Sequence, residues 1–242
     1  RWTAVLSFFL IALIGFGKMA RSSQESAPPK AGPSDMSGMV MDRDNQTHVT
    51  ETMSHHMHMG PHMKMTALRP ANAEDTKRAD EIVKTLQADL QKYTDYHAAI
   101  DDGYRIFLPN FPQPEYHFTN YRYGFRAAFK FDPARPTSLL YKKTPDGYEL
   151  VGAMYTAPLS SSEDALNSRV PLSVARWHLH VNICLPPRGQ ALSTDWTKFG
   201  PRGSITTEEE CTAAGGRFMP HLFGWMVHVY PFEQDPQDIW AH

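Results

Sequence analysis

Residues 176–184 alternate between two chemically different sets of side chains, and this alternation constrains the fold of the chain more than any other feature. Successive side chains of a β-strand point to opposite faces, so the pattern indicates a strand with one face in a core. The apolar set consists of Trp177, Leu179, Val181 and Ile183. The polar set consists of Arg176, His178, His180, Asn182 and Cys184. Two imidazoles two residues apart on one face are close enough to bind one metal ion.

A second segment, residues 223–232, repeats this arrangement. Its apolar face carries Trp225, Val227 and Val229, and its other face carries Met226, His228 and Tyr230. If this strand pairs with the predicted strand 174–185, His228 joins His178 and His180 in a set of three. His117, in the segment 115–120, is a fourth candidate.

Three imidazoles and one water molecule make a typical catalytic zinc site, and imidazole-rich sites also suit copper and iron. We therefore predict a metal site formed by His178, His180, His228 and His117. The alternative is a polar sheet face on which the histidines contact water or ordinary hydrogen-bond partners. His97, on the apolar stripe of a predicted helix, is a reserve candidate that is typical of a hydrogen-bonded core residue.

The N-terminal segment predicts export. Residues 2–17 form an uncharged apolar run, which is typical of a secretory signal peptide within residues 1–20. A run of 16 residues is short for a membrane span, which needs about 20. Cleavage after Ala20 would place Lys18 where a small residue is expected, so membrane anchoring through residues 2–17 is the alternative. Both interpretations predict a periplasmic or secreted protein.

Export also bears on the two cysteines, Cys184 and Cys211. In an oxidising compartment the simplest prediction is one structural disulfide. The alternative is a thiolate metal ligand, because Cys184 is on the same predicted face as the histidines.

Residues 21–70 have the composition of a disordered linker. Within it, residues 36–65 contain eight of the twelve methionines and five of the twelve histidines. Thioether sulfur suits Cu(I), and imidazole suits Cu(II), nickel and zinc. We call residues 36–65 the Met/His arm and predict that it captures copper. The alternatives are a low-complexity linker or, in part, a purification tag.

The remaining residues, 71–242, are predicted to form a single α+β domain. Apolar residues spaced by three and four predict a long N-terminal helix over residues 73–102, which Gly103 ends. A mainly antiparallel β-sheet is predicted to follow this helix, and a small barrel or sandwich is an alternative arrangement of its strands. Further strands are predicted at residues 104–108, 116–118, 123–131, 138–143 and 148–155. A short helix near 207–214 is predicted to begin with a capping box formed by Thr206 and Glu209.

Several short motifs resemble a family of uncharacterised exported bacterial domains. They are Ala-Ala-Ile-Asp-Asp-Gly-Tyr at 98–104, His-Phe-Thr-Asn at 117–120, Phe-Asp-Pro-Ala-Arg-Pro at 131–136, Leu-Leu-Tyr at 139–141 and Leu-Val-Gly-Ala-Met-Tyr at 150–155. The similarity covers about residues 80–155. It implies a secreted domain in which His117 is a site residue, and it implies no activity.

The net charge of -2, with basic residues spread along the chain, gives no indication of a nucleic-acid partner, so we expect none, and no nucleotide or phosphate motif is present. We expect an exported metal-binding protein that sequesters copper, delivers it or confers tolerance to it. Zinc and iron are the other ions that such a site accepts. The main alternative is a secreted mononuclear metalloenzyme, hydrolytic or oxidative, with Glu115 or Glu233 as a general base. A structural domain with incidental histidines is the third possibility.

Overall fold

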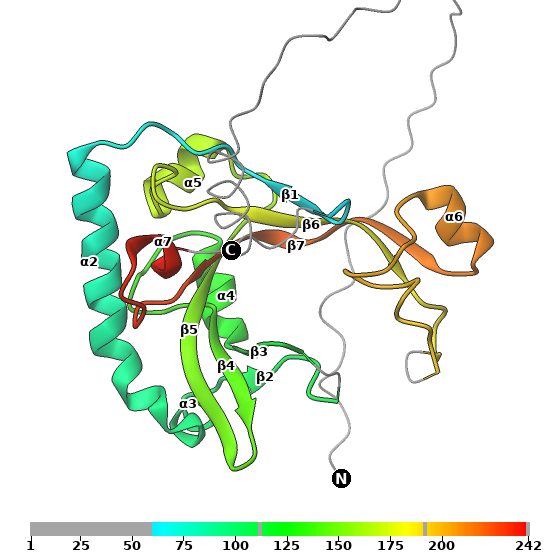
Figure 1. Ribbon diagram of the computed structural model, residues 1–242, viewed down its shortest axis with the longest axis horizontal. Coiled ribbons are helices and arrows are strands. Elements are labelled where there is room, and N and C mark those ends of the chain that lie inside the picture. Colours follow the sequence, from blue (N-terminus) through cyan, green and yellow to red (C-terminus); the bar gives the residue numbers. More distant parts are fainter. Residues whose placement is uncertain (1–59, 111–112, 191–192, 241–242) are drawn as a thin grey trace, which may run out of the picture. The chain divides into compact units, whose positions relative to one another are not determined.

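The computed structural model describes residues 60–110, 113–190 and 193–240. Within these residues the chain forms one open, antiparallel, seven-stranded sheet with strand order β1-β6-β7-β5-β4-β3-β2 (Figure 1). The strands are β1 (Met63–Met65), β2 (Arg105–Ile106), β3 (Tyr116–Thr119), β4 (Ser138–Thr144), β5 (Gly147–Ala157), β6 (His178–Leu185) and β7 (Arg217–Val229). The predicted α+β class with a mainly antiparallel sheet is confirmed. The sheet has two edges, β1 and β2, and is neither a closed barrel nor a sandwich.

Helices of varied length connect and cover these strands. They are α2 (Ala73–Leu90), a 3₁₀ helix (Gln91–Thr94), α3 (Tyr96–Asp101), α4 (Tyr121–Ala127), α5 (Glu163–Arg169), α6 (Glu208–Ala213) and α7 (Pro236–Ile239). Figure 1 shows α2 beside the sheet and α6 at the far end of the ribbon formed by β6 and β7.

The long N-terminal helix predicted over residues 73–102 is wrong in two respects. Strand β1 precedes α2, and the continuous helical segment ends at Thr94. Asp95 has an extended backbone, and its side chain accepts a hydrogen bond from the backbone N–H of His97 at 2.9 Å. This is the geometry of an N-cap, so Asp95 starts a new helix rather than continuing the old one. As a consequence His97 is exposed and is not on the buried stripe.

The strand predicted over residues 123–131 is also wrong, because this segment begins in helix α4. The side chain of Asn120 accepts a hydrogen bond from the backbone N–H of Tyr123 at 3.1 Å and caps the helix. A cap of this kind satisfies an otherwise unpaired N–H group and overrides the strand preference of the aromatic residues that follow.

The main core lies between α2 and one face of the sheet. The helix contributes Ile82, Leu86 and Leu90, and the sheet contributes the predicted apolar sets of β6 and β7, including Trp177, Leu179, Trp225, Val227 and Val229. The sequence alternation in both strands is therefore confirmed on this face. The histidines of the same strands consequently point to the opposite face.

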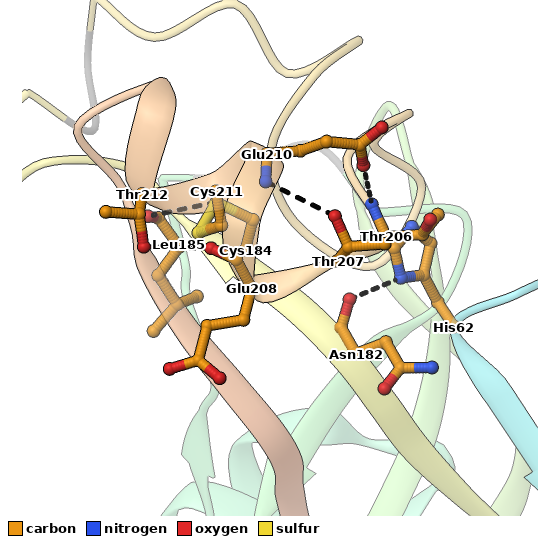
Figure 2. Close-up of a disulfide and its surroundings, with 10 residues drawn as sticks. All are labelled: His62, Asn182, Cys184, Leu185, Thr206, Thr207, Glu208, Glu210, Cys211 and Thr212. Atoms are coloured by element: carbon orange, nitrogen blue, oxygen red, sulfur yellow. Dashed lines mark hydrogen bonds between the residues drawn. A yellow bond between two sulfur atoms is a disulfide. The ribbon is translucent and has the colours of Figure 1, made fainter. Parts of the chain in front are cut away.

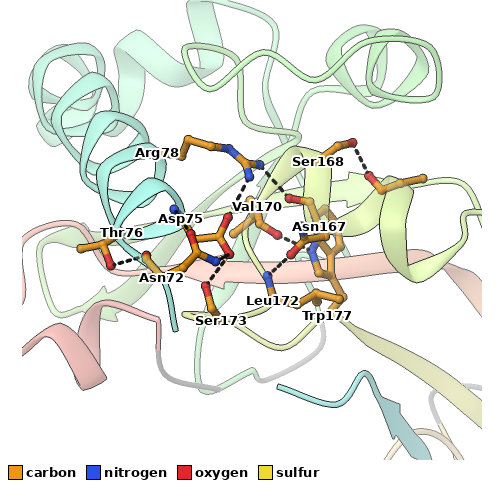
Figure 3. Close-up of polar contacts among 11 residues, drawn as sticks. Asn72, Asp75, Thr76, Arg78, Asn167, Ser168, Val170, Leu172, Ser173 and Trp177 are labelled. Carbon is orange, nitrogen blue, oxygen red and sulfur yellow. Dashed lines mark hydrogen bonds and ion pairs between the residues drawn. The ribbon is translucent and has the colours of Figure 1, made fainter. Parts of the chain in front are cut away.

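The first turn of α2 is fixed by a polar network around the buried carboxylate of Asp75 (Figure 3). One carboxylate oxygen accepts hydrogen bonds from Asn72 at 2.8 Å and Ser173 at 2.9 Å, and the other accepts from Arg78 at 2.9 Å. Arg78 also donates to the backbone carbonyl of Asn167 at 2.7 Å. The network ties α2 to the segment that leads from α5 into β6.

Replacing Asn72 with Ala should lower the free energy of unfolding by about 1 kcal/mol, the usual effect of removing an N-cap. The Asn72 side chain accepts from the backbone N–H of Asp75 at 2.9 Å, and Ala removes this bond together with the bond to the Asp75 carboxylate. Urea denaturation would measure the change. Thr85→Ala is the control, because its hydroxyl bonds only the Glu81 carbonyl within the same helix. Equal stabilities for the two variants would contradict the capping role.

The end of β6 is joined covalently to α6. Cys184 and Cys211 form a disulfide (Figure 2), as the sequence predicted, so neither is available as a thiolate ligand. The capping box of α6 lies one residue later than predicted. Thr207 accepts from the backbone N–H of Glu210 at 3.2 Å, and the Glu210 carboxylate accepts from the backbone N–H of Thr206 at 3.3 Å.

Two predictions concern residues outside the described ones: the signal peptide or membrane anchor at 1–20, and the Met/His arm up to residue 59. Within residues 60–110, 113–190 and 193–240, no helix has the length and apolar character needed to cross a membrane.

Candidate metal centre

The four predicted histidines come from three strands and meet on the face of the sheet opposite α2. His178 and His180 are on β6, His228 is on β7 and His117 is on β3. Strands β6 and β7 pair directly, with His178 opposite Met226. His178 and His228 are buried, and His117 and His180 are partly buried.

The imidazole rings form a chain of close neighbours. Ring centroids are 5.6 Å apart for His180 and His178, 5.2 Å for His178 and His228, and 5.6 Å for His228 and His117. His180 also acts electrostatically on the ionisation of His117, which links the two ends of the chain. The structure therefore brings all four predicted side chains into one cluster, which we call the histidine cluster.

His117 reaches this cluster because the sheet is strongly curved. Its strand, β3, is three positions away from β7 in the sheet, which in a flat sheet corresponds to roughly 14 Å. The 5.6 Å separation of the rings of His117 and His228 requires the face that carries the histidines to be concave. The register between β4 and β5 shifts between Leu140 and Tyr141, where β5 carries the extra residue Val151, and a β-bulge of this kind bends and twists its strand.

Burial favours the uncharged form of two of the imidazoles, His117 and His180. Desolvation and, to a smaller extent, the nearby His180 lower the pKa of His117 to about 4, against the effect of a hydrogen bond to the Glu115 backbone. Desolvation also lowers the pKa of His180, and His62 acts in the same direction. Neutral imidazole is the form that binds metal, so both side chains are in the ligand form at neutral pH.

A hydrogen bond to the Glu115 backbone holds the His117 side chain. Metal-binding histidines are typically oriented in this way by a carbonyl or carboxylate. Within the part of the chain that the structure describes, the buried Nδ1 atom of His180 has no hydrogen-bond partner.

The ring nitrogens of the histidine cluster do not surround a common point. Among the described residues, no group of three or more His, Cys, Asp or Glu side chains is positioned to hold a metal ion as the side chains stand. The terminal torsion of a histidine is broad, so a turn of the ring moves its nitrogens without moving the backbone.

Other candidate residues lie away from the cluster or are engaged elsewhere. Both ring nitrogens of His62 contact backbone carbonyl oxygens. Figure 2 shows the contact with Asn182, at 2.9 Å, and the other is with Gly203 at 2.7 Å. His97 is exposed and contacts Asp95 at 2.8 Å. Glu233 is exposed in the turn after β7.

Glu115 is the predicted carboxylate that lies near the cluster. It accepts a hydrogen bond from the hydroxyl of Tyr230 at 2.9 Å, and the Tyr230 ring centroid is 6.3 Å from that of His228. Burial and the Glu115 carboxylate raise the pKa of Tyr230, so the tyrosine keeps its proton. The sequence named Glu115 as a possible base but did not predict its partner.

A surface depression lies elsewhere, between α4 and β5. Its lining includes Tyr123, Arg126, Lys130, Arg135 and Tyr155, and it contains none of the four histidines. The histidine cluster therefore does not form the wall of this pocket.

The methionines that lie next to His178 and His180 were not predicted from the sequence. Strand β1 lies beside β6 with Met63 opposite His180 and Met65 opposite His178, although residues 63–65 were expected to belong to the linker. Met63 and Met65 do alternate with Lys64 in the same period-two pattern as the histidines, but three residues are too few for this pattern to predict a strand.

Comparisons with protein-family descriptions, with curated proteins and with solved structures found no match to this chain. The site itself is therefore the basis for a functional conclusion.

Proposed function

We propose that this protein is an exported metal-binding protein, that its ion is copper, and that His117, His178, His180 and His228 hold the ion. Zinc and iron are the other ions that an imidazole-rich site accepts. The role that follows is sequestration or delivery of the metal, or tolerance to it.

The observation that carries this proposal is the gathering of four imidazoles from three strands. A metal–nitrogen distance of about 2.0–2.1 Å places two imidazole centroids roughly 5 Å apart around a tetrahedral ion. The measured separations of 5.2 Å and 5.6 Å are close to this value.

Two further features support export and copper. The disulfide between Cys184 and Cys211 fits an oxidising compartment. The Met/His arm is rich in the two side chains that bind Cu(I) and Cu(II), and it runs directly into the sheet that carries the histidine cluster.

The proposal is tested by Zn(II) and Cu(II) titration of the full chain in competition with a chromophoric chelator. The double variant His178→Ala/His180→Ala should weaken the tightest site by at least about 100-fold, since even the loss of residues that only orient a ligand weakens binding 10- to 100-fold. His178→Gln/His180→Gln, which retains polarity and hydrogen bonding, should give the same loss. Circular dichroism and urea denaturation would verify that each variant is folded.

The matched control is a double variant in the arm, His55→Ala/His56→Ala. It removes the same number of imidazoles but should leave the affinity of the tightest site within a few-fold of the unmodified protein. Unchanged affinity in the folded His178/His180 variants would refute the proposal. So would an equal loss in the arm variant, because the arm would then supply the tightest site.

A metalloenzyme using the same ligands is the second candidate, and the pair formed by Glu115 and Tyr230 favours it. A carboxylate near a metal can accept a proton from bound water. In that case the bound ion keeps a coordination position for water. Water-proton relaxation of the Cu(II)-loaded protein would distinguish the two functions: rapid exchange indicates an open position and an enzyme, and its absence indicates a closed site for storage or delivery.

A further inference from the structure

Strand β1 brings the last part of the Met/His arm to the histidine cluster. Its register with β6 pairs Met63 with His180 and Met65 with His178. Residues directly opposite each other in an antiparallel pair lie on the same face, with Cβ atoms about 4.5–5.5 Å apart. The two thioether side chains are therefore on the concave face, next to two of the four imidazoles.

Hydrogen bonds at both ends of β1 fix this register. Before the strand, the backbone N–H of Val181 donates to the carbonyl of His62 at 2.9 Å, and the His62 ring contacts two further carbonyls. After the strand, Thr66 N–H donates to the Trp177 carbonyl at 2.9 Å, and Trp177 N–H donates to the Thr66 hydroxyl at 3.0 Å. A slip of one residue would break these bonds and move both methionines to the other face.

Methionine also lies opposite histidine deeper in the sheet. Met226 on β7 pairs with His178, and Met154 on β5 pairs with His228. These two side chains are buried and pack with Leu140. Met63 and Met65, in contrast, are only partly buried. Their thioethers are thus accessible to an ion that arrives from solvent or from the arm.

We propose that the preferred cargo of the histidine cluster is Cu(I), and that Met63 and Met65 of β1 supply thioether ligands to it alongside His178 and His180. This inference rests on the proposed function and names the oxidation state and the additional ligands. Thioether sulfur is a soft donor that selects Cu(I), whereas Zn(II) and Cu(II) are bound well by imidazole alone. Ligands from β1 also make the end of the arm part of the binding site, so that an ion held by the arm is delivered along a continuous chain segment.

The competing explanation is that the two methionines only fill space. Leucine has a similar volume and no sulfur, so Met→Leu substitutions keep packing nearly unchanged and separate the two explanations. A packing role predicts no change in metal binding. A ligand role predicts a loss that is specific for Cu(I).

The test is Cu(I) titration of the full chain under ascorbate, in competition with a chromophoric Cu(I) chelator. Met63→Leu/Met65→Leu should weaken the tightest Cu(I) site about tenfold or more, in line with the loss expected when the surroundings of a metal are disrupted. The affinity for Zn(II), measured in parallel, should change only a few-fold. X-ray absorption at the copper edge should show sulfur neighbours in the unmodified protein and fewer of them in the variant.

Two controls locate the effect. Met57→Leu/Met59→Leu removes two thioethers from the arm before β1, and Met219→Leu removes one from β7 opposite Ile183, away from the histidines. Both should leave the tightest Cu(I) site unchanged. An equal loss for the Met57/Met59 variant would overturn the inference, because the sulfur ligands would then belong to the rest of the arm.

The possible failures are distinguishable. If His178→Ala/His180→Ala abolishes metal binding but Met63→Leu/Met65→Leu leaves Cu(I) affinity unchanged, the inference is wrong and the proposed function stands. If the histidine variants bind all ions as tightly as the unmodified protein, the proposed function itself fails. A parallel loss of Cu(I) and Zn(II) in the Met63/Met65 variant would point to disturbed structure and would also count against the inference.

Discussion

Replacing Trp177 with Ala should lower the free energy of unfolding by about 3–5 kcal/mol, the largest effect that we expect from a single core substitution in this chain. The indole is 0% exposed and packs in the core between α2 and the sheet. Removing it leaves a cavity that the surrounding residues fill only in part. Its ring N–H also donates to the Val170 carbonyl at 3.4 Å, a long bond that adds little (Figure 3).

Urea or guanidinium denaturation would measure this loss, with an unchanged slope indicating that the same two states are compared. Trp177→Phe is the matched control, because it keeps an aromatic ring in the core and should have a clearly smaller effect. A loss below about 1 kcal/mol for the Ala variant would contradict the central position of the β6 core face. Because Trp177 directly precedes His178, the Ala variant should also reduce metal affinity, by loosening the strand that holds the histidines.

The sequence was sufficient to predict the parts of the fold that depend on strong local patterns. Alternation in the β6 and β7 segments predicted which side chains enter the core. It failed where a single capping side chain decides the structure. Asp95 ends the expected long helix and Asn120 starts an unexpected one, and both act through one hydrogen bond to the backbone. Periodicity carries no information about such bonds.

The same contrast applies to the histidine cluster. His178, His180 and His228 could be grouped from sequence because their strands are regular and pair directly. The position of His117 depends on the curvature of the sheet across β5 and β4, which arises from bulges and twist rather than from residue type. The position of Met63 depends on a three-residue strand, which is too short for its alternation to be distinguished from chance.

Acid should destabilise the metal-free protein through His117. Its folded-state pKa is lowered to about 4, from an ordinary value of 6.5. As the pH falls below 6.5, the unfolded chain takes up a proton that the folded protein does not, so the free energy of unfolding decreases. The contribution of His117 to the free energy of unfolding is fully present above pH 6.5. It is lost as the pH falls from 6.5 to 4, at about 1.4 kcal/mol per pH unit, or roughly 3 kcal/mol in total. His180 contributes in the same direction.

Denaturation of the metal-free protein at a series of pH values from 7 to 4 would measure this dependence. His117→Phe removes the titrating group and should reduce the slope in this range, whereas Trp177→Phe should lower stability at every pH with the slope unchanged. The same slope for His117→Phe and the unmodified protein would show that the folded protein protonates His117 as readily as the unfolded chain does.

Metal should counteract the acid effect if the histidine cluster binds it, because the ion and the proton compete for the same nitrogen lone pairs. Saturating Zn(II) should stabilise the folded state at pH 7. As the pH falls, the stabilisation by metal decreases once protons displace the ion, so the acid unfolding transition is shifted to lower pH and becomes steeper. In His178→Ala/His180→Ala the transition should be the same with and without Zn(II), since the remaining two imidazoles are too few to hold the ion. If the acid unfolding of the unmodified protein is the same with and without Zn(II), its acid sensitivity arises from desolvation of the histidines, which the fold imposes. Such a result would count against metal binding by the histidine cluster, which the proposed function requires.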